Sequence, residues 1–428
     1  MLGLSSDDHL LEQPPYGGSG TAEAFSQVNW LMSAPGGTRT PGRLLRRQLL
    51  YPTELQAPGL QLWRIKVTRG QQCEDEPGPT QARSWRAGRP SLPIVKFVKA
   101  AIGRSCVAAQ CTRSQAGRGW PLAVGLLAGA AADALLGDPR RGHPVALFGR
   151  AAQAVQDRVY ADSRLRGAGY AAGCVLAAAA PAAIAQRLTR GRPSLRLAVT
   201  AAAAWTVTGA RSLTTEAERN YAALRAGNLT AARAALPSLC GRDPGHLDEK
   251  ELARAVIESV AENTCDAVVA PLVWGVLAGL PGLAGYRAVN TLDAMVGYRS
   301  PTYARFGWAS ARLDDVVNWA PARLTGLLAA ACAPAAGGRP GDAWRAMRRD
   351  GARHPSPNAG RCEAAFAGAL GVRLGGTNLY AGAAEHRPSL GQGHEPEPGD
   401  IRRAVRLCRA VTIAATAAAA VVAAIGGR

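Results

Sequence analysis

The chain contains 428 residues and carries a formal net charge of +19 at pH 7. Hydrophobic residues make up 47% of the sequence but aromatic residues only 5%, so the apolar content comes mainly from small side chains, which let helices pack closely in a bilayer. The positive charge suits lipid headgroups and phosphates, whereas the lack of a basic stripe interleaved with aromatic residues argues against nucleic-acid binding. The nine cysteines show no CxxC spacing, which disfavours both a cysteine metal site and a disulfide framework.

Residues 1–118 form the first distinct part of the sequence. They are rich in Gly, Pro, Arg and Ser, and they show neither a helical period nor a two-residue alternation. We predict that they form a disordered extension, separate from a membrane domain at 119–428, and that the native start of translation lies downstream of Met1. A genuine basic tail that contacts lipid headgroups is the alternative.

Apolar segments recur through the rest of the chain. They comprise residues 121–136, 170–185, 195–210, 267–289, 324–336 and 404–426. A helix needs about 20 residues to cross the hydrocarbon core, a length that only the fourth and the last segments reach. We therefore predict an all-α fold, a polytopic membrane helical bundle with helical loops in the cytoplasm. The second and third segments should pair as a helical hairpin, whose basic turn at 186–193 favours the cytoplasmic side.

The order of these segments raises a question of topology. If the fourth and fifth both crossed the bilayer, the loop between them would face the opposite side from its neighbours. Pro271, Pro281 and several glycines interrupt the fourth segment, and the fifth is short. We expect one or both to be re-entrant or buried against protein, so that the three polar loops share one cytoplasmic site. These loops are residues 211–266, 290–321 and 339–400.

A stripe of carboxylates precedes the fourth apolar segment. Asp248 and Glu251 have the pattern of a capping box that begins a helix running to about residue 263. On this helix Glu258, Glu262 and Asp266 are spaced four apart, and like charges at this spacing repel one another unless a cation binds them. A solvated polar face with an internal Glu–Arg pair is the alternative. Because Mg²⁺ prefers one or two carboxylates together with phosphate oxygens, we predict that these three residues bind a metal ion beside a nucleotide.

Polar residues also cluster in the loop that follows. Helical spacing pairs Arg312 with Asp315 and Asp314 with Asn318. Tryptophans flank this stretch, either to stack on the planar ring of a ligand or to form an interfacial belt.

Two shorter groups complete the candidates. His354, Ser356 and Asn358 stand between prolines, either as a backbone-bonded turn or as a phosphate-contacting loop. The second group follows the first apolar segment, either as a charged interfacial turn or as part of the site. It comprises Asp138, Arg140 and His143.

Six ordered blocks of sequence, taken together, resemble the adenosylcobinamide-phosphate synthases, the CobD/CbiB family of cobalamin biosynthesis. The blocks are residues 137–144, 241–248, 258–266, 290–298, 306–319, and 354–360 with its continuation at 368–376. The resemblance runs from about Gly119 to the C-terminus and does not include residues 1–118.

The resemblance implies an integral membrane amide ligase. Such an enzyme joins aminopropanol, or its O-phosphate, to the free propionate of adenosylcobyric acid with cleavage of ATP. It lies in the cell membrane with its site facing the cytoplasm, and other late cobalamin-pathway enzymes are candidate partners. Because a carboxylate is a poor acyl electrophile, ATP must activate it, which requires Mg²⁺ and cationic groups around the phosphoryl group. A related membrane sensor or regulator without ligase chemistry is the alternative.

The same resemblance suggests a role for each polar residue. We expect Arg312 to stabilise charge and His354 or Asp293 to accept the proton of the attacking amine. The residues expected to bind substrate or nucleotide are Asp138, Arg140, His143, Arg242, Asp243, Asn263, Asn290, Asp314, Asp315, Asn318, Ser356 and Asn358.

Overall fold

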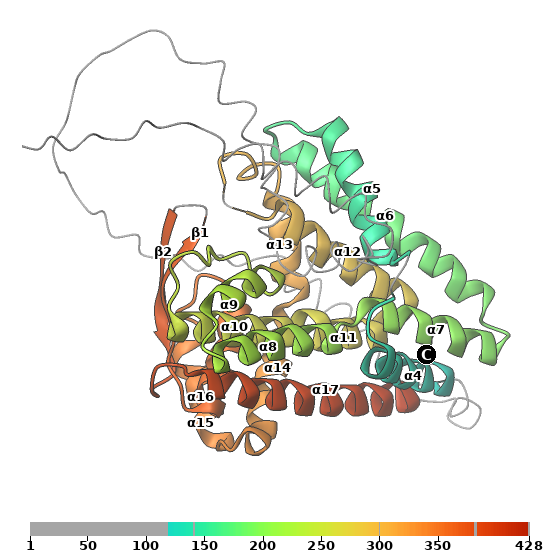
Figure 1. Ribbon diagram of the computed structural model, residues 1–428. Helices are drawn as coiled ribbons and strands as arrows, with labels where there is room; N and C mark the ends of the chain where they lie inside the picture. The colour runs from blue at the N-terminus through green and yellow to red at the C-terminus, as the bar shows by residue number, and fades with distance from the viewer. Residues whose placement is uncertain (1–118, 140–141, 299, 381–382, 427–428) are drawn as a thin grey trace, which may run out of the picture. The chain divides into compact units, whose positions relative to one another are not determined.

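The computed structural model describes residues 119–139, 142–298, 300–380 and 383–426. The predicted disordered extension, 1–118, and the predicted site residue Arg140 lie outside these ranges. The described chain is almost entirely helical (Figure 1), which confirms the all-α prediction. Its helices are α4 (Trp120–Leu136), α5 (Pro144–Val159), α6 (Arg164–Leu188), α7 (Pro193–Val207), α8 (Ala210–Arg225), α9 (Leu229–Ala235), α10 (Glu249–Thr264), α11 (Ala270–Ala278), α12 (Leu280–Val296), α13 (Trp308–Val317), α14 (Trp319–Cys332), α15 (Pro340–Asp350), α16 (Ala359–Leu370) and α17 (Pro398–Gly426).

The described residues contain one β-sheet, which is an antiparallel hairpin. Strands β1 (Leu374–Tyr380) and β2 (Ala383–Leu390) pair with a register irregularity between Leu374 and Gly376. The hairpin contacts α10 and α16, so it is positioned beside the carboxylate stripe that the sequence singled out.

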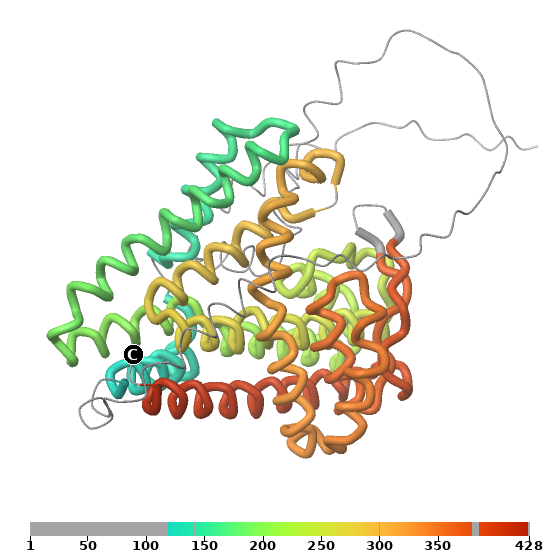
Figure 2. Tube along the Cα trace, turned by 180° about the vertical axis from the view of Figure 1, so that it is seen from behind, coloured from blue at the N-terminus to red at the C-terminus, as the bar shows by residue number. Residues whose placement is uncertain are grey.

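Three helices are long and apolar enough to cross a membrane. They are Arg164–Leu188, Glu249–Ala278 and Pro398–Gly426. Helix α4 is a shorter apolar helix, and it packs along α7 and α17 (Figures 1 and 2). Two glycines allow α4 and α7 to approach each other closely. A Cβ on Gly125 would lie only 2.7 Å from Thr200 Cβ, and one on Gly129 only 2.4 Å from Ala204 Cβ. These features confirm the predicted membrane helical bundle.

The second of these long helices carries the carboxylate stripe and continues past Pro271. The capping box predicted at Asp248 and Glu251 is present, and α10 runs through a π-helical turn, Cys265–Val269, directly into α11. Proline lacks an N–H, so the carbonyl of Ala267, four residues earlier, loses its helical donor. That carbonyl instead accepts a hydrogen bond from Gly209 N at 3.1 Å. The prediction that Pro271 interrupts the segment was therefore wrong.

The chain reverses instead at Gly279, between α11 and α12. Gly279 has φ +69°, and a Cβ there would lie 2.1 Å from the side-chain oxygen of Gln186, so this position requires glycine. The same oxygen accepts a hydrogen bond from Leu280 N at 2.8 Å. Helix α12 then returns along α11 and α6. The fourth apolar segment thus goes out and back, as the sequence analysis anticipated.

This reversal brings the three polar loops together. Helix α14, which contains most of the fifth apolar segment, packs against α15, α16 and α17 and is not among the long apolar helices. Residues from all three loops line one cavity, described below. The predicted convergence on a shared site is therefore present in the fold.

The basic turn at 186–193 lies at the other end of the carboxylate-bearing helix. The predicted packing of its two flanking helices into a hairpin was wrong, because α6 packs against α12 and α7 packs against α4. Gln186 contacts the turn that follows Ala278, the last residue of this helix. Glu249, the first residue of the helix, lies 29 positions earlier. If Glu249–Ala278 crosses the membrane, its two ends face opposite sides. In that case the turn at 186–193 and the candidate site cannot both face the cytoplasm, so one of these two predictions must fail.

Single-cysteine labelling checks this arrangement. In a background without native thiols, we expect cysteines replacing Glu249 and Arg190, both exposed, to react with a membrane-impermeant maleimide from opposite sides. The comparison uses intact cells and inverted vesicles. Labelling of both positions from the same side would show that this helix does not cross.

Candidate functional site

A small polar cavity lies where the three polar loops meet. Its volume is about 30 Å³, room for a water molecule or an ion but not for a nucleotide. A larger ligand must therefore approach from the open side of the cavity. The lining residues are Glu262, Cys265, Asp266, Asp314, Asn318, Ala322, Ser356, Asn358, Ala359 and Cys362.

Neutral hydrogen-bond donors hold the aspartates at this cavity. Asn318 donates to Asp314 Oδ2 at 2.9 Å, and the hydroxyl of Tyr286 donates to the amide oxygen of Asn318 at 2.9 Å. Asn290 on α12 donates to Asp266 Oδ2 at 3.4 Å. The amide side chains orient the carboxyl groups without supplying a positive charge, so a cation could still pair with them.

Burial, and to a lesser extent neighbouring carboxylates, raises the pKa values of the aspartates at and near the cavity. Burial, with further contributions from Asp315 and Glu262, raises the pKa of Asp314 to about 7 against the opposing hydrogen bond from Asn318. Burial likewise raises the pKa of Asp293 on α12 well above its usual range, and Asp314 and Asp315 add to the effect. A bound cation would reverse these shifts by favouring the ionised carboxylates.

The predicted metal ligands separate into two environments. Glu262 and Asp266 line the cavity, with Glu262 exposed, whereas Glu258 is buried and faces other partners. Within the described ranges no group of three or more His, Cys, Asp or Glu side chains is arranged to hold a metal ion. Mg²⁺ is commonly held by one or two carboxylates plus phosphate oxygens, so Glu262 and Asp266 at the cavity would provide enough protein ligands when a nucleotide supplies the remaining oxygens. The metal site stays a prediction.

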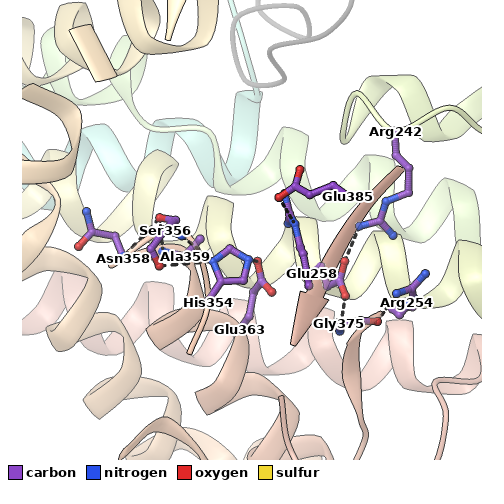
Figure 3. Close-up of polar contacts among 11 residues, drawn as sticks. Arg242, Arg254, Glu258, His354, Ser356, Asn358, Ala359, Glu363, Gly375 and Glu385 are labelled. Atoms are coloured by element: carbon purple, nitrogen blue, oxygen red, sulfur yellow. Dashed lines mark hydrogen bonds and ion pairs between the residues drawn. The ribbon is translucent and has the colours of Figure 1, made fainter. Parts of the chain in front are cut away.

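Glu258 forms a buried ion pair with Arg242. The two charged groups lie 2.5 Å apart, and the side chains are 4% and 3% exposed. The second carboxylate oxygen accepts a hydrogen bond from Gly375 N at 2.8 Å (Figure 3). One turn earlier, Arg254 donates to the carbonyls of Gly375 and Thr377. Glu258 thus ties the 241–248 loop and the β-hairpin to α10, and the solvated face considered for this helix is wrong at Arg254 and Glu258 because both are buried.

His354 faces a glutamate that the sequence analysis missed. Its Nε2 lies 3.8 Å from Glu363 on α16, and both side chains are buried (Figure 3). Its Nδ1 accepts a hydrogen bond from Ser356 N at 3.0 Å. Burial lowers the pKa of His354 and raises the pKa of Glu363 well above its usual range, where Glu258 adds to the rise. Both shifts favour the neutral forms of the two side chains.

The backbone-bonded turn foreseen for His354 continues into α16. Ser356 Oγ accepts hydrogen bonds from Asn358 N and Ala359 N, at 3.3 and 3.2 Å. The amide of Asn358 donates to the carbonyl of Asp315 at 2.8 Å. This chain of contacts places Ser356 and Asn358 at the cavity. Glu363 had one sequence signal, an acidic residue within a helix of otherwise mainly small and apolar side chains.

Several other predicted residues lie apart from the cavity. Arg312 forms an exposed ion pair with Asp315 at 3.5 Å, and its side chain is 67% exposed. His143 caps α5 through Val145 N, and Asp138 is buried beside the end of α4. Asp243 accepts a hydrogen bond from Gly245 N, and Asn263 donates to Ser259 O within α10. None of these side chains lines the cavity.

The flanking tryptophans are exposed and carry arginines over their rings. Arg164 lies 5.5 Å from the ring centroid of Trp308, and Arg323 lies 4.2 Å from that of Trp319. Trp308 and Trp319 are 43% and 56% exposed. This geometry fits the interfacial alternative, since an exposed indole paired with a cation suits the headgroup region.

Comparisons with known proteins agree with this organisation. The family model described as CobD/Cbib protein matches residues 126–408, more than half of the chain. Cobalamin biosynthesis protein CobD of Mycobacterium tuberculosis is 53% identical over 289 residues, which cover 68% of this chain and 92% of that protein. The protein of the same name in Geobacter metallireducens is 45% identical over 272 residues, covering 62% and 85%. The one in Rhodobacter capsulatus is 49% identical over 207 residues, covering 48% and 65%.

No solved structure matches the chain. The family match spans α10, α12, α13 and α16, the helices whose side chains and adjoining loops build the cavity and its surroundings. The resemblance drawn from six sequence blocks is therefore confirmed: the chain belongs to the CobD/CbiB family.

Proposed function

We propose that the protein is an ATP-dependent amide ligase, an adenosylcobinamide-phosphate synthase that joins aminopropanol or its O-phosphate to the free propionate of adenosylcobyric acid. Membership of a family named for cobalamin biosynthesis supports a role in that pathway. The observation that carries the proposed chemistry is the cavity at which Glu262 and Asp266, from the end of one long helix, meet Asp314 from α13. Carboxylates gathered in this way suit a Mg²⁺–nucleotide complex.

The activation step requires phosphoryl transfer from ATP to the propionate. When bound, Mg²⁺ supplies charge neutralisation at the phosphates. Glu262, exposed at the cavity, and Asp266, held by Asn290, would hold the ion. Asn318 keeps Asp314 oriented toward the same space. The small size of the cavity leaves the nucleotide and the corrin on its open side, which Ser356 and Asn358 border.

The second step requires a base for the amine. We assign this role to Asp293 on α12, a carboxyl group close enough to Asp314 and Asp315 for their charges to affect its pKa, which can accept the proton when it is ionised. His354 is better suited to positioning. Its Nδ1 is engaged by Ser356 N and its Nε2 faces Glu363, so the pair orients the loop that carries Ser356 and Asn358.

The proposed location is the cell membrane, with ATP and the corrinoid reaching the site from the cytoplasm. Three apolar helices of sufficient length support a membrane protein. The pairing of Arg164 with Trp308 and of Arg323 with Trp319 supports a headgroup region close to α13 and α14.

A mass-based assay tests the reaction. Membranes that contain the protein are incubated with adenosylcobyric acid, ATP, Mg²⁺ and either aminopropanol or its O-phosphate. We expect a corrinoid whose mass has increased by the amine minus water, formed only when ATP and Mg²⁺ are both present. Binding of the corrinoid without any ATP-dependent product from either amine would contradict the proposal and favour a sensor.

A further inference from the structure

A largely apolar groove lies between α5 and α6. Its volume is about 470 Å³, within the range of small-molecule sites. Arg166 is the one charged residue among those lining it. The lining residues are Val155, Val159, Leu165, Arg166, Gly169, Tyr170, Gly173, Cys174 and Ala177.

Two glycines keep this groove open. A Cβ on Gly169 or on Gly173 would meet no atom within 4 Å, so neither glycine is needed for close packing within the chain. They lie on α6, a helix long and apolar enough to cross a membrane. Only 17% of the most apolar stretch of this helix is buried. Exposed apolar surface on such a helix faces hydrocarbon, so the groove opens toward lipid chains.

Aromatic and basic side chains surround the end of the groove at the start of α6. Tyr160 and Trp308 are 42% and 43% exposed. The hydroxyl of Tyr160 donates to Thr302 O at 2.9 Å, and Arg164 lies over the ring of Trp308. Exposed tyrosine and tryptophan mark the level of the headgroups. Arg166, which is also exposed, therefore stands where a lipid phosphate would lie.

We propose that this groove binds one anionic phospholipid, with its phosphate against Arg166 and an acyl chain along Gly169, Gly173 and Ala177. Small residues at four-residue spacing also suit contact between two helices. The side chains that line the groove favour a lipid over a second helix. Val155 and Leu165, which are 41% and 83% exposed, lie beside the glycines, where close packing of a second helix would require a flat surface. A narrow flexible chain fits between them. This inference is independent of the proposed reaction.

The test fills the groove without disturbing the protein. Gly173→Leu places a side chain in open space, and Gly169→Leu is a second variant of the same design. Ala180→Leu is the matched control, because Ala180 is exposed on α6 but does not line the groove. The full chain is reconstituted in vesicles of phosphatidylcholine and phosphatidylglycerol. In one preparation phosphatidylcholine carries a photoactivatable acyl chain, and in another phosphatidylglycerol carries it. Lipid crosslinked to α5 and α6 is then measured by mass spectrometry.

We expect Gly173→Leu and Gly169→Leu to lose the crosslink while Ala180→Leu retains it. Arg166→Gln should keep labelling by phosphatidylcholine but lower the preference for phosphatidylglycerol about fivefold, the effect of one cation near the membrane surface. Wild-type crosslinking in both glycine variants would overturn the proposal. So would conversion of a dimer to a monomer by these variants with lipid labelling unchanged, because the groove would then hold a second copy of the chain.

Discussion

Glu262→Gln is expected to remove nearly all ATP-dependent amide formation while the protein accumulates normally in the membrane. Glu262 is exposed at the cavity shared with Asp266 and Asp314, and no hydrogen bond or ion pair within the described ranges engages its carboxylate. Glutamine keeps its size but not its charge. We expect a loss of at least about a hundredfold in turnover, roughly 2.7 kcal/mol of transition-state stabilisation.

The control for this substitution is Glu249→Gln, an exposed position in the first turn of the same helix. It should leave turnover unchanged. Membrane levels and the thermal midpoint of the purified variants show whether folding is preserved. Wild-type turnover in Glu262→Gln would remove this residue from the site and direct the search for cation ligands to Asp293, Asp314 and Asp315.

Arg242→Met is expected to act on stability. It leaves the Glu258 carboxylate, which is 4% exposed, without the guanidinium that lies 2.5 Å away. Breaking a buried pair by removing one partner typically costs about 3 to 5 kcal/mol. We therefore expect a large fall in the thermal midpoint and in membrane levels, measured on detergent-purified protein and on isolated membranes.

The double variant Arg242→Met with Glu258→Leu separates charge from packing. Replacing both members of a buried pair by apolar groups is often close to neutral, so the double variant should be more stable than Arg242→Met alone. A thermal midpoint for Arg242→Met equal to that of the wild type would contradict the structural role assigned to this pair.

Local signals in the sequence predicted much of the helical framework. The capping box at Asp248 and Glu251 is a short-range pattern, and it marks the start of α10 correctly. The reversal within the fourth apolar segment also followed from local composition, although Gly279 rather than Pro271 produces it. The continuation past Pro271 depends on a hydrogen bond from Gly209, a residue that periodicity within the segment does not reveal.

The site was harder to predict than the framework. Four-residue spacing correctly placed Glu258, Glu262 and Asp266 along one helix, but spacing does not say what covers each residue. Glu258 meets Arg242 and Gly375, which lie 16 residues before it and 117 residues after it. Glu363 and His354 likewise meet only through the tertiary fold.

The π-helical turn at Cys265–Val269 sets the rotational phase between the two halves of the long helix. A π turn accommodates an extra residue within an otherwise α-helical path, and each α-helical residue rotates the chain by about 100°. A one-residue deletion between Glu258 and this turn would rotate Glu258 around the axis relative to α11, whereas a deletion within the turn would return it to α-helical winding and displace Asp266. Asp266 sits inside the turn, where Tyr286 contacts its carbonyl oxygen at 3.3 Å. The winding of the helix between Glu262 and Pro271 thus determines how Asp266 meets the cavity, in addition to the chemical identity of its side chain.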